Sequence, residues 1–525
     1  MKELAIKKLI TKKLISKKLV ACAALIVAMA LLPAAHAQER LAQGPQQGTY
    51  YQVFLRSFAD SDGDGIGDLN GLTGKLDYLS GLGVTGIWLM PSFPSPSYHG
   101  YDIADYYGIH PDYGTMEDFE AFLREASDRG ISVLLDLVIN HTSSEHPWFQ
   151  ASRDPDSPYR DWYRWSDDGE GVNLNAMSMG QRTWNETESG YYAGLFWDQM
   201  PDLNLDNLDL RQEIKNIAKF WLDKGVAGFR LDAAMHIYSF AEMGPGERTP
   251  SALNLAWWGE FADYCRSVNP DCYLVGEVWD SPGTRAQYAA PLGSVFHFDM
   301  GETLARVIVG GSNKGNAFAN SMKMEYDRLA QANPNAINAI FLSNHDQTRI
   351  CTALRNDIDN LKMAASVYLT MQGLPFVYYG EELGMMGGKP DENIRTPFLW
   401  AEDDPALCTW IDSVYNRKVA RFDEQNADPG SLLCHYRRLM TLRAAAPALF
   451  MGVLEPLEQP NDAVMSYSMT APGQTAWVLH NLSTEPQTVL LDGSGAVLFV
   501  TYEEGFAVRD GSVILPPKCS VVMEK

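Results

Sequence analysis

The chain has 525 residues, of which 46% are hydrophobic and 21% are charged. These proportions are ordinary for a globular protein with a large core, and they exclude disorder for most of the chain. The net charge is −24, and a surface of that sign repels phosphate backbones, so we expect no nucleic-acid partner. At roughly 150 residues per domain, the length has room for two or three domains.

The first 37 residues have the composition of a targeting segment. They contain seven lysines and one glutamate, a net charge of +6 that leaves −30 for residues 38–525. An apolar run over 20–32 is followed by Ala35, His36 and Ala37, which match an A-x-A cleavage site. We expect a signal peptide cleaved after Ala37 and a secreted or periplasmic protein with no membrane contact. The lipoprotein-like sequence LVAC at 19–22 is an alternative, but its apolar run follows the cysteine instead of preceding it.

Cleavage after Ala37 leaves an even number of cysteines, which permits disulfides in an exported protein. Cys265 and Cys272 end a helical pattern and begin a strand pattern, so they are the best local pair, although other pairings stay open. The chain has no C-x-x-C spacing, which argues against a zinc site. The six cysteines are Cys265, Cys272, Cys351, Cys408, Cys434 and Cys519.

Short apolar segments alternate with amphipathic helical patterns from residue 49 to about 445. Helices are predicted between the strands, for example over 115–129 and 210–224. Eight strands that alternate with helices predict an α/β fold of the (β/α)₈ TIM barrel type, built from residues 48–140 and 209–447. The predicted strands span 49–55, 83–91, 132–138, 228–233, 273–279, 294–301, 337–346 and 375–381.

Two segments depart from this alternation. Residues 141–208 are rich in Trp, Asp, Ser, Gly and Asn and show no helical period, so we predict an inserted small domain B after strand 3. Residues 448–525 change to short alternating strands with Gly and Pro turns, which predicts a C-terminal antiparallel β-sandwich domain.

Polar residues stand at the ends of four predicted strands, where a barrel of this kind builds its active site. Arg230 and Asp232 are two residues apart and therefore share one face, while Phe229 and Leu231 face the helices. Arg230 would hold Asp232 ionised, as a nucleophile requires. Glu277 follows an apolar strand, and such surroundings raise a carboxyl pKa and favour a protonated general acid. Two carboxyls in opposed environments are the pair that glycoside hydrolysis needs.

Four segments at the predicted strand ends are DLVINH at 136–141, GFRLDAAMH at 228–236, EVW at 277–279 and FLSNHD at 341–346, and a fifth segment is MPDLN at 200–204. Together they resemble the signature segments of the α-amylase family of glycoside hydrolases (family 13). The resemblance covers nearly all of the chain after residue 37. It implies double displacement with retention, with Asp232 as nucleophile, Glu277 as general acid/base and Asp346 as stabiliser of the transition state.

The resemblance also implies residues that bind the sugar at the cleavage point, among them Arg230, His141 and His345. The segment YHGYD at 98–102 resembles the family segment that places an aromatic ring under that sugar. Two further polar residues near the strand ends complete the set. The predicted substrate-binding residues are His99, Tyr101, Asp136, His141, Arg230, His236 and His345.

The segment DSDGDGIGDLNG at 60–71 predicts a calcium loop. Asp60, Asp62 and Asp64 fall at positions 1, 3 and 5 of a calcium loop. The Ile66 carbonyl falls at position 7 and Asp68 at position 9. The twelfth position is Gly where an EF-hand has Glu, and the flanks are a strand and a barrel helix, so we expect a structural Ca²⁺ site and not a sensor. A similar loop occurs in the family branch that includes oligo-1,6-glucosidases. Separately, Asn140 resembles a ligand of a second calcium site known in many amylases.

The subtype signals place the chain in a branch intermediate between oligo-1,6-glucosidases and neopullulanases. MPDLN lies between the QPDLN and MPKLN of those two groups, Ala233 resembles α-1,4-acting members, and NIRTPFLW at 393–400 resembles the oligo-1,6-glucosidase side. We expect a monomeric α-amylase that cleaves α-1,4-glucosidic bonds in starch, maltodextrins and maltooligosaccharides. An exo-acting α-glucosidase or oligo-1,6-glucosidase, and a 4-α-glucanotransferase, are the alternatives. A non-catalytic sugar-binding protein is disfavoured, because all three carboxylate positions are filled.

Overall fold

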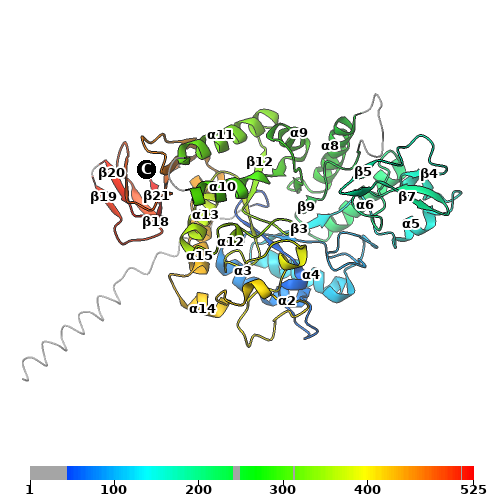
Figure 1. Cartoon of the computed structure of the whole chain (residues 1–525), viewed down its shortest axis with the longest axis horizontal. Coiled ribbons are helices and arrows are strands. Elements are labelled where there is room, and N and C mark those ends of the chain that lie inside the picture. Colours follow the sequence, from blue (N-terminus) through cyan, green and yellow to red (C-terminus); the bar gives the residue numbers. More distant parts are fainter. Residues whose placement is uncertain (1–43, 240–248, 311–313, 510) are drawn as a thin grey trace, which may run out of the picture. The chain divides into compact units, whose positions relative to one another are not determined.

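A computed structural model describes residues 44–239, 249–310, 314–509 and 511–525, so the predicted signal peptide lies outside the described residues. Eight parallel strands close into a barrel in the order β1-β13-β12-β11-β10-β9-β3-β2. Figure 1 labels β3, β9 and β12 of this barrel. All eight predicted strands are present, and each ends before its predicted last residue. The prediction of strand over 294–301 is wrong for residues 299–301, which begin a helix. The strands are β1 (Tyr50–Val53), β2 (Gly86–Leu89), β3 (Ser132–Leu137), β9 (Gly228–Leu231), β10 (Tyr273–Gly276), β11 (Ser294–Phe296), β12 (Ile337–Phe341) and β13 (Leu374–Tyr378).

Helices follow the strands around the barrel, and both helices predicted as examples are present as α4 (Met116–Asp128) and α6 (Leu208–Asp223). Helix α4 begins at a capping box, in which the side chains of Thr115 and Asp118 each accept the other's backbone N–H. The other barrel helices are α2 (Leu69–Gly74), α3 (Leu76–Leu82), α8 (Pro250–Val268), α9 (Pro282–Leu292), α10 (Asp299–Gly310), α11 (Gly315–Ala332), α12 (Ile350–Ala353), α13 (Ile358–Thr370), α14 (Phe422–Ala427), α15 (Leu432–Ala445) and α16 (Pro447–Met451).

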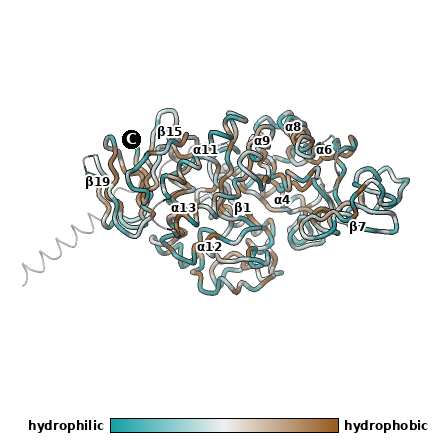
Figure 2. The backbone as a smooth tube through the Cα atoms, turned by 45° about the horizontal axis from the view of Figure 1, so that its top comes forward, coloured by the Kyte–Doolittle hydropathy of each residue, from teal (hydrophilic) through white to brown (hydrophobic). Residues whose placement is uncertain are grey.

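Side chains along each strand alternate between two hydrophobic cores. Residues that point into the barrel form an aromatic cluster that includes Tyr50, Trp88 and Phe376. Outward residues such as Phe229 and Leu231 join the larger core under the helices, as predicted. Figure 2 shows hydrophobic segments running through the region around β1. Rings fill much of the barrel interior, and its charged inward residues Asp136 and Arg230 lie toward the carboxyl ends of β3 and β9.

The inserted domain follows β3, as predicted. It contains helix α5 (Pro147–Ser152), a three-stranded antiparallel sheet and a short hairpin. Residue 141 forms a bridge with residue 202, so both ends of the insertion meet beside the barrel. The sheet is formed by β4 (Trp165–Ser166), β8 (Gly190–Ala193) and β7 (Trp184–Thr187), and the hairpin by β5 (Met177–Ser178) and β6 (Gln181–Arg182).

The C-terminal segment forms two antiparallel sheets, with strand orders β14-β15-β16-β21-β18 and β17-β20-β19. Leu479 and Val521 from the larger sheet share one hydrophobic cluster with Val489 and Val513 from the smaller sheet. None of the helices in the described part of the chain is both long and apolar enough to cross a bilayer. The strands are β14 (Val453–Pro456), β15 (Val464–Ala471), β16 (Gln474–Asn481), β17 (Gln487–Leu490), β18 (Ala496–Val500), β19 (Ala507–Arg509), β20 (Ser512–Leu515) and β21 (Ser520–Glu524).

The six cysteines are free thiols in this structure, including the predicted local pair. Cys265 and Cys272 are both buried. A hydrogen bond with Cys272 and burial together raise the pKa of the Cys265 thiol. The two side chains are therefore neighbours, as their positions at the end of α8 and the start of β10 predicted, but they are not bridged.

Arg443, on α15, is fully buried and joins two chain segments at the start of the barrel. Its guanidinium donates to backbone carbonyls before β1, in the last turn of α13 and between α13 and β13. Burial lowers its pKa to about 10, so it stays protonated at neutral pH. The four acceptors are the carbonyls of Gly48 (3.3 Å), Leu369 (3.0 Å), Met371 (3.0 Å) and Gly373 (2.5 Å).

We expect Arg443→Met to lower the free energy of unfolding by about 3–5 kcal/mol, because four buried carbonyls lose their donor. Urea unfolding followed by circular dichroism measures this change. Arg443→Lys keeps the charge but reaches fewer carbonyls, so its loss should be smaller. A variant with Met at this position that unfolds at the wild-type urea concentration would contradict this account.

Candidate active site

Arg230 connects three carboxylates at the carboxyl end of the barrel. It is 1% exposed and is the inward residue of β9 opposite Asp136 of β3. Its Nη1 donates to Asp136 Oδ1 (2.8 Å) and Asp232 Oδ1 (2.5 Å), and its Nη2 donates to Glu277 Oε2 (2.7 Å). One guanidinium therefore brings together Asp232 and Glu277, the two carboxyls that the sequence marks as the reactive pair.

Small residues shape the backbone of this strand end. Gly228 has φ of +153°, and a Cβ there would lie 1.9 Å from the carbonyl oxygen of Tyr273 on β10, so a larger residue does not fit. Ala233 has φ of 45°, a left-handed conformation that is uncommon outside glycine. Its N–H donates to Glu277 Oε2 (2.9 Å). The unusual turn after Asp232 thus supplies a second donor that fixes Glu277.

Burial raises the pKa of both reactive carboxyls. The pKa of Asp232 rises to about 6, because burial and the nearby Asp136 outweigh the opposing effect of Arg230. The pKa of Glu277 rises to about 7, as burial and the charge of Asp232 again outweigh Arg230. The prediction for Glu277 is confirmed in direction. Arg230 acts on Asp232 as expected, but burial is the larger effect, and Asp232 still loses its proton before Glu277.

We predict a bell-shaped pH dependence of kcat/KM with its maximum between about pH 6 and 7. A nucleophilic Asp232 must be ionised, so activity rises as the pH increases through its pKa of about 6. An acidic Glu277 must be protonated, so activity falls as the pH passes its pKa of about 7. Because Asp232 and Glu277 interact, the acidic and alkaline sides of the profile give apparent pKa values of the pair. Initial rates across roughly pH 4–9 test this, and a flat profile over that range would contradict it.

Tyr101, His345 and Asp346 form a second group beside the Arg230 cluster. The Tyr101 hydroxyl donates to Asp136 Oδ2 (3.1 Å) and lies 2.7 Å from His345 Nε2. The two rings stack with centroids 5.4 Å apart and an interplanar angle of 8°. His345 Nε2 also lies 3.1 Å from Asp346 Oδ2. The structure therefore brings all three predicted catalytic carboxylates into one connected network.

The other three predicted histidines surround this network. His99 Nδ1 accepts the Tyr101 N–H (3.1 Å), and His141 Nε2 lies 3.1 Å from the Tyr101 carbonyl oxygen, so both contact the backbone of that residue. His236 is further out, where its ring packs against Phe196, which also packs against His141 (both 5.5 Å). Burial lowers the pKa of all three, which favours their neutral forms.

Three residues that no sequence signal selected as site residues also belong to the network. Trp88 Nε1 donates to Asp136 Oδ2 (3.1 Å), and Gln52 Nε2 lies 2.8 Å from His345 Nδ1. Both are inward residues of predicted strands, so strand alternation was a signal that could have found them. Arg395 Nη2 donates to Asp346 Oδ1 (3.0 Å) and its Nε to the His345 carbonyl (3.0 Å). It lies in a loop, where no periodicity marks it.

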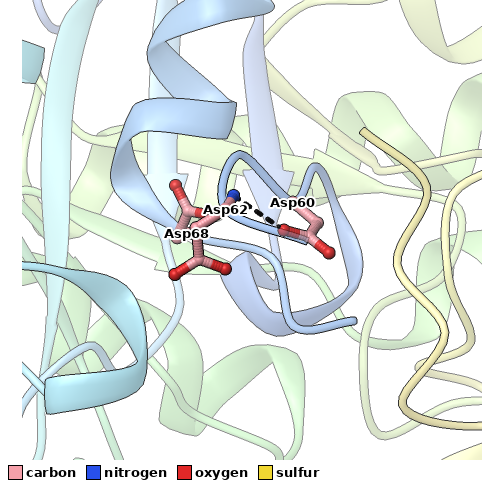
Figure 3. Close-up of side chains that lie close together, drawn as sticks. All are labelled: Asp60, Asp62 and Asp68. Atoms are coloured by element: carbon pink, nitrogen blue, oxygen red, sulfur yellow. Dashed lines mark hydrogen bonds between the residues drawn. The ribbon is translucent and has the colours of Figure 1, made fainter. Parts of the chain in front are cut away.

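The Asp60, Asp62 and Asp68 carboxylates converge in the loop between the 3₁₀ turn η1 (Leu55–Ser57) and α2 (Figure 3). Their oxygens lie within 4.8 Å of one another, with Asp60 and Asp68 buried and Asp62 exposed. Asp60 also accepts backbone N–H groups of the same loop, including that of Asp62 (3.0 Å). Three converging carboxylates suit a hard divalent cation, which takes oxygen ligands.

The other predicted ligands of this loop are placed differently. Asp64 lies outside the converging group, and its Oδ1 accepts the Ile66 N–H (2.7 Å). Asn140, the predicted ligand of a second calcium site, is buried and donates to Asp202 Oδ1 (3.2 Å). Within the described residues, the group at Asp60 is the only one of three or more acidic, histidine or cysteine residues whose ligand atoms all lie within 4.8 Å of one another.

Comparison with known proteins agrees with this fold. Residues 52–452 match the family model for the alpha amylase catalytic domain. The chain is 42% identical to "Alpha-amylase 3" of Dictyoglomus thermophilum over 90% of this chain and 92% of the relative. It is 31% identical to an oligo-1,6-glucosidase of Parageobacillus thermoglucosidasius over 83% of this chain and 90% of the relative. The crystal structure of the alpha-amylase from H. orenii superposes with a TM-score of 0.84 at 41% identity, covering 91% of this chain and 99% of that one.

The chain therefore belongs to the α-amylase family of glycoside hydrolases, family 13. Within that family it is an enzyme of the α-amylase type. The family resemblance drawn from the five sequence segments is confirmed.

Proposed function

We propose that this enzyme cleaves α-1,4-glucosidic bonds in starch, maltodextrins and maltooligosaccharides by double displacement, with retention at the anomeric carbon. The observation that carries the proposal is that Asp232 and Glu277 bind the same guanidinium, that of Arg230. This shared contact keeps the carboxyls close, which supports the retaining arrangement, in which they are about 5–5.5 Å apart.

In the first step Glu277 donates its proton to the glycosidic oxygen while Asp232 attacks the anomeric carbon. This breaks the glycosidic bond and forms a glycosyl ester. In the second step ionised Glu277 takes a proton from water, and the water oxygen attacks the anomeric carbon, which releases the sugar and regenerates the Asp232 carboxylate. The pKa order of the two carboxyls suits these roles at near-neutral pH.

The neighbouring residues would orient the sugar and stabilise the positive charge that develops on it. Asp346 is held by Arg395 and lies beside His345, so its charge is fixed before substrate binds. Tyr101 supplies an aromatic face that His345 and Asp136 hold in place. We propose that His99, His141 and His236 complete the contacts to the substrate.

A time course of soluble starch digestion, with products separated by length, tests the proposed substrate and mode of attack. A rapid fall in iodine staining with mixed maltooligosaccharides is the result we expect. Glucose released from the start with iodine staining preserved would instead indicate an exo-acting α-glucosidase. Products longer than a maltooligosaccharide substrate would indicate a 4-α-glucanotransferase.

We also propose that Asp60, Asp62 and Asp68 bind Ca²⁺, with the Ile66 carbonyl and Asp64 as ligands if the loop adjusts around the ion. A cation held at 100 times its dissociation constant stabilises the native state by about 2.7 kcal/mol. The ion would offset the repulsion between the converging carboxylates and stabilise the conformation of the loop.

We expect EGTA to lower the thermal midpoint of unfolding and added Ca²⁺ to restore it, as measured by scanning calorimetry. Asp62→Asn should remove most of this response. Asp168→Asn is a matched control, because both aspartates are exposed and both accept the backbone N–H two residues ahead (3.2 and 2.9 Å). A midpoint that EGTA does not move, or an equal response in both variants, would contradict the proposed calcium site.

We further propose that the enzyme is exported as a monomer after cleavage behind Ala37. The lysine-rich start, the apolar run and the A-x-A sequence support export and the cleavage site. Sequencing of the mature amino terminus tests it, and a terminus that begins at Cys22 would indicate a lipoprotein.

A further inference from the structure

Trp410 lies between the Asp60–Asp68 loop and Arg395. Its backbone N–H donates to the Gly65 carbonyl of that loop (3.1 Å). Its Nε1 donates to the hydroxyl of Ser57 (2.8 Å), and this hydroxyl donates in turn to the Arg395 carbonyl (2.5 Å). The backbone of Arg395 is thus connected to the loop through Trp410 and a buried serine.

The ring of Trp410 reaches the Arg395 side chain by a second route. It stacks on Tyr98, with centroids 5.6 Å apart and an interplanar angle of 29°. The Arg395 guanidinium lies over the same Tyr98 ring, 5.9 Å from its centroid. Phe54 packs edge-on against both rings. The two routes hold both ends of Arg395, its carbonyl and its guanidinium.

Arg395 is itself 4% exposed and contacts the candidate active site directly, through Asp346 Oδ1 and the His345 carbonyl (both 3.0 Å). A carboxylate that stabilises a transition state must be oriented before the reaction begins. If the Arg395 guanidinium moves, the Asp346 carboxylate that it binds loses its fixed orientation.

We propose that Trp410 is a positioning residue for the hydrolytic reaction. It fixes the backbone and guanidinium of Arg395, and through Arg395 it fixes the Asp346 carboxylate, while the Asp60–Asp68 loop anchors Trp410. This inference rests on the proposed function, in which Asp346 acts on the sugar at the cleavage point.

Trp410→Ala should lower kcat on a nitrophenyl maltooligoside on the order of 10- to 100-fold, because misplacement by about 1 Å can cost that much. KM should stay within roughly 3-fold, since the side chain acts on the carboxylate and not on the bound sugar. Trp410→Phe keeps a ring against Tyr98 and should retain kcat within roughly 3-fold. Thermal unfolding of each variant shows that rates are compared between folded proteins.

A double-mutant cycle tests whether Trp410 acts through Arg395. In the Arg395→Ala background, Trp410→Ala should change kcat by less than about 2-fold, because the residue it positions is gone. Effects that multiply in the double variant would overturn the proposal. So would a rise in KM with kcat unchanged, since Trp410 would then contact substrate.

Trp477→Ala is the control for removing an indole outside the candidate active site, because Trp477 is 4% exposed and lies on β16 of the C-terminal domain. If Trp410→Ala and Trp477→Ala have the same kcat, the proposal is wrong. If Trp410→Ala does not fold, Ser57→Ala removes the hydroxyl that joins Trp410 Nε1 to the Arg395 carbonyl. This variant should lower kcat only when Arg395 is present. A wild-type enzyme inactive on every α-glucan would defeat the proposed function, whereas an active wild type with unaffected Trp410→Ala and Ser57→Ala variants would defeat this inference alone.

Discussion

Asp232→Asn is expected to lower kcat on starch by at least about 10⁴-fold, the scale of loss seen when a catalytic nucleophile is removed. The amide is isosteric, so its oxygen can still accept from Arg230 Nη1, the contact that Asp232 makes at 2.5 Å. The loss would therefore reflect missing nucleophilicity more than a disordered site. Initial rates of reducing-end release, with thermal unfolding as a check on folding, measure it.

Asp136→Asn is the matched comparison, since Asp136 is a second buried carboxylate on the same guanidinium (2.8 Å). Its loss should be smaller, because Asp136 positions Arg230 and Tyr101 and does not attack the sugar. Equal losses of kcat in the two variants would indicate that activity depends on the total charge around Arg230. They would contradict the role of Asp232 as the nucleophile. Trapping with an activated fluoroglycoside and mass spectrometry should place the label on Asp232, and a label on Asp346 or Asp136 would contradict the assignment.

Glu277→Gln should lower kcat on starch by about 10²–10⁴-fold, the usual contribution of a positioned acid. The loss in the first chemical step should be much smaller for an aryl glycoside whose leaving group needs no proton. The Gln side chain can keep the contacts that Glu277 accepts from Arg230 Nη2 and the Ala233 N–H. The alkaline limb of the pH profile should also disappear.

Comparing a natural maltooligosaccharide with an aryl maltooligoside in this variant distinguishes proton donation from a structural role. Equal losses on both substrates would contradict the role of acid. An alkaline limb that persists in Glu277→Gln would show that another group carries the pKa of about 7 assigned to Glu277.

The barrel strands and the residues at their ends were predictable, because alternation and the position of polar residues after apolar runs are local properties of the sequence. Arg230 and Asp232 share a face through strand periodicity alone, and the structure places both on one network. Arg395 was not predictable in this way. Its contact with Asp346 depends on the path of a loop that no local pattern specifies.

Burial and loop geometry account for the other differences. The Asp232 pKa rises because the whole site is buried, a tertiary effect that the neighbouring Arg230 in the sequence does not reveal. Asp64 fits a ligand position by spacing, yet its carboxylate accepts the Ile66 N–H. In the inserted domain, Trp184 is buried and Trp197 is 41% exposed, a distinction that composition alone does not make.

The stereochemistry of the first product tests the central claim most directly. Proton NMR of maltopentaose during the first minutes of digestion resolves the anomer released before mutarotation equilibrates it. Double displacement through Asp232 predicts that the α-anomer appears first. A β-anomer formed first would show single displacement by water and would contradict the pairing of Asp232 as nucleophile with Glu277 as acid and base.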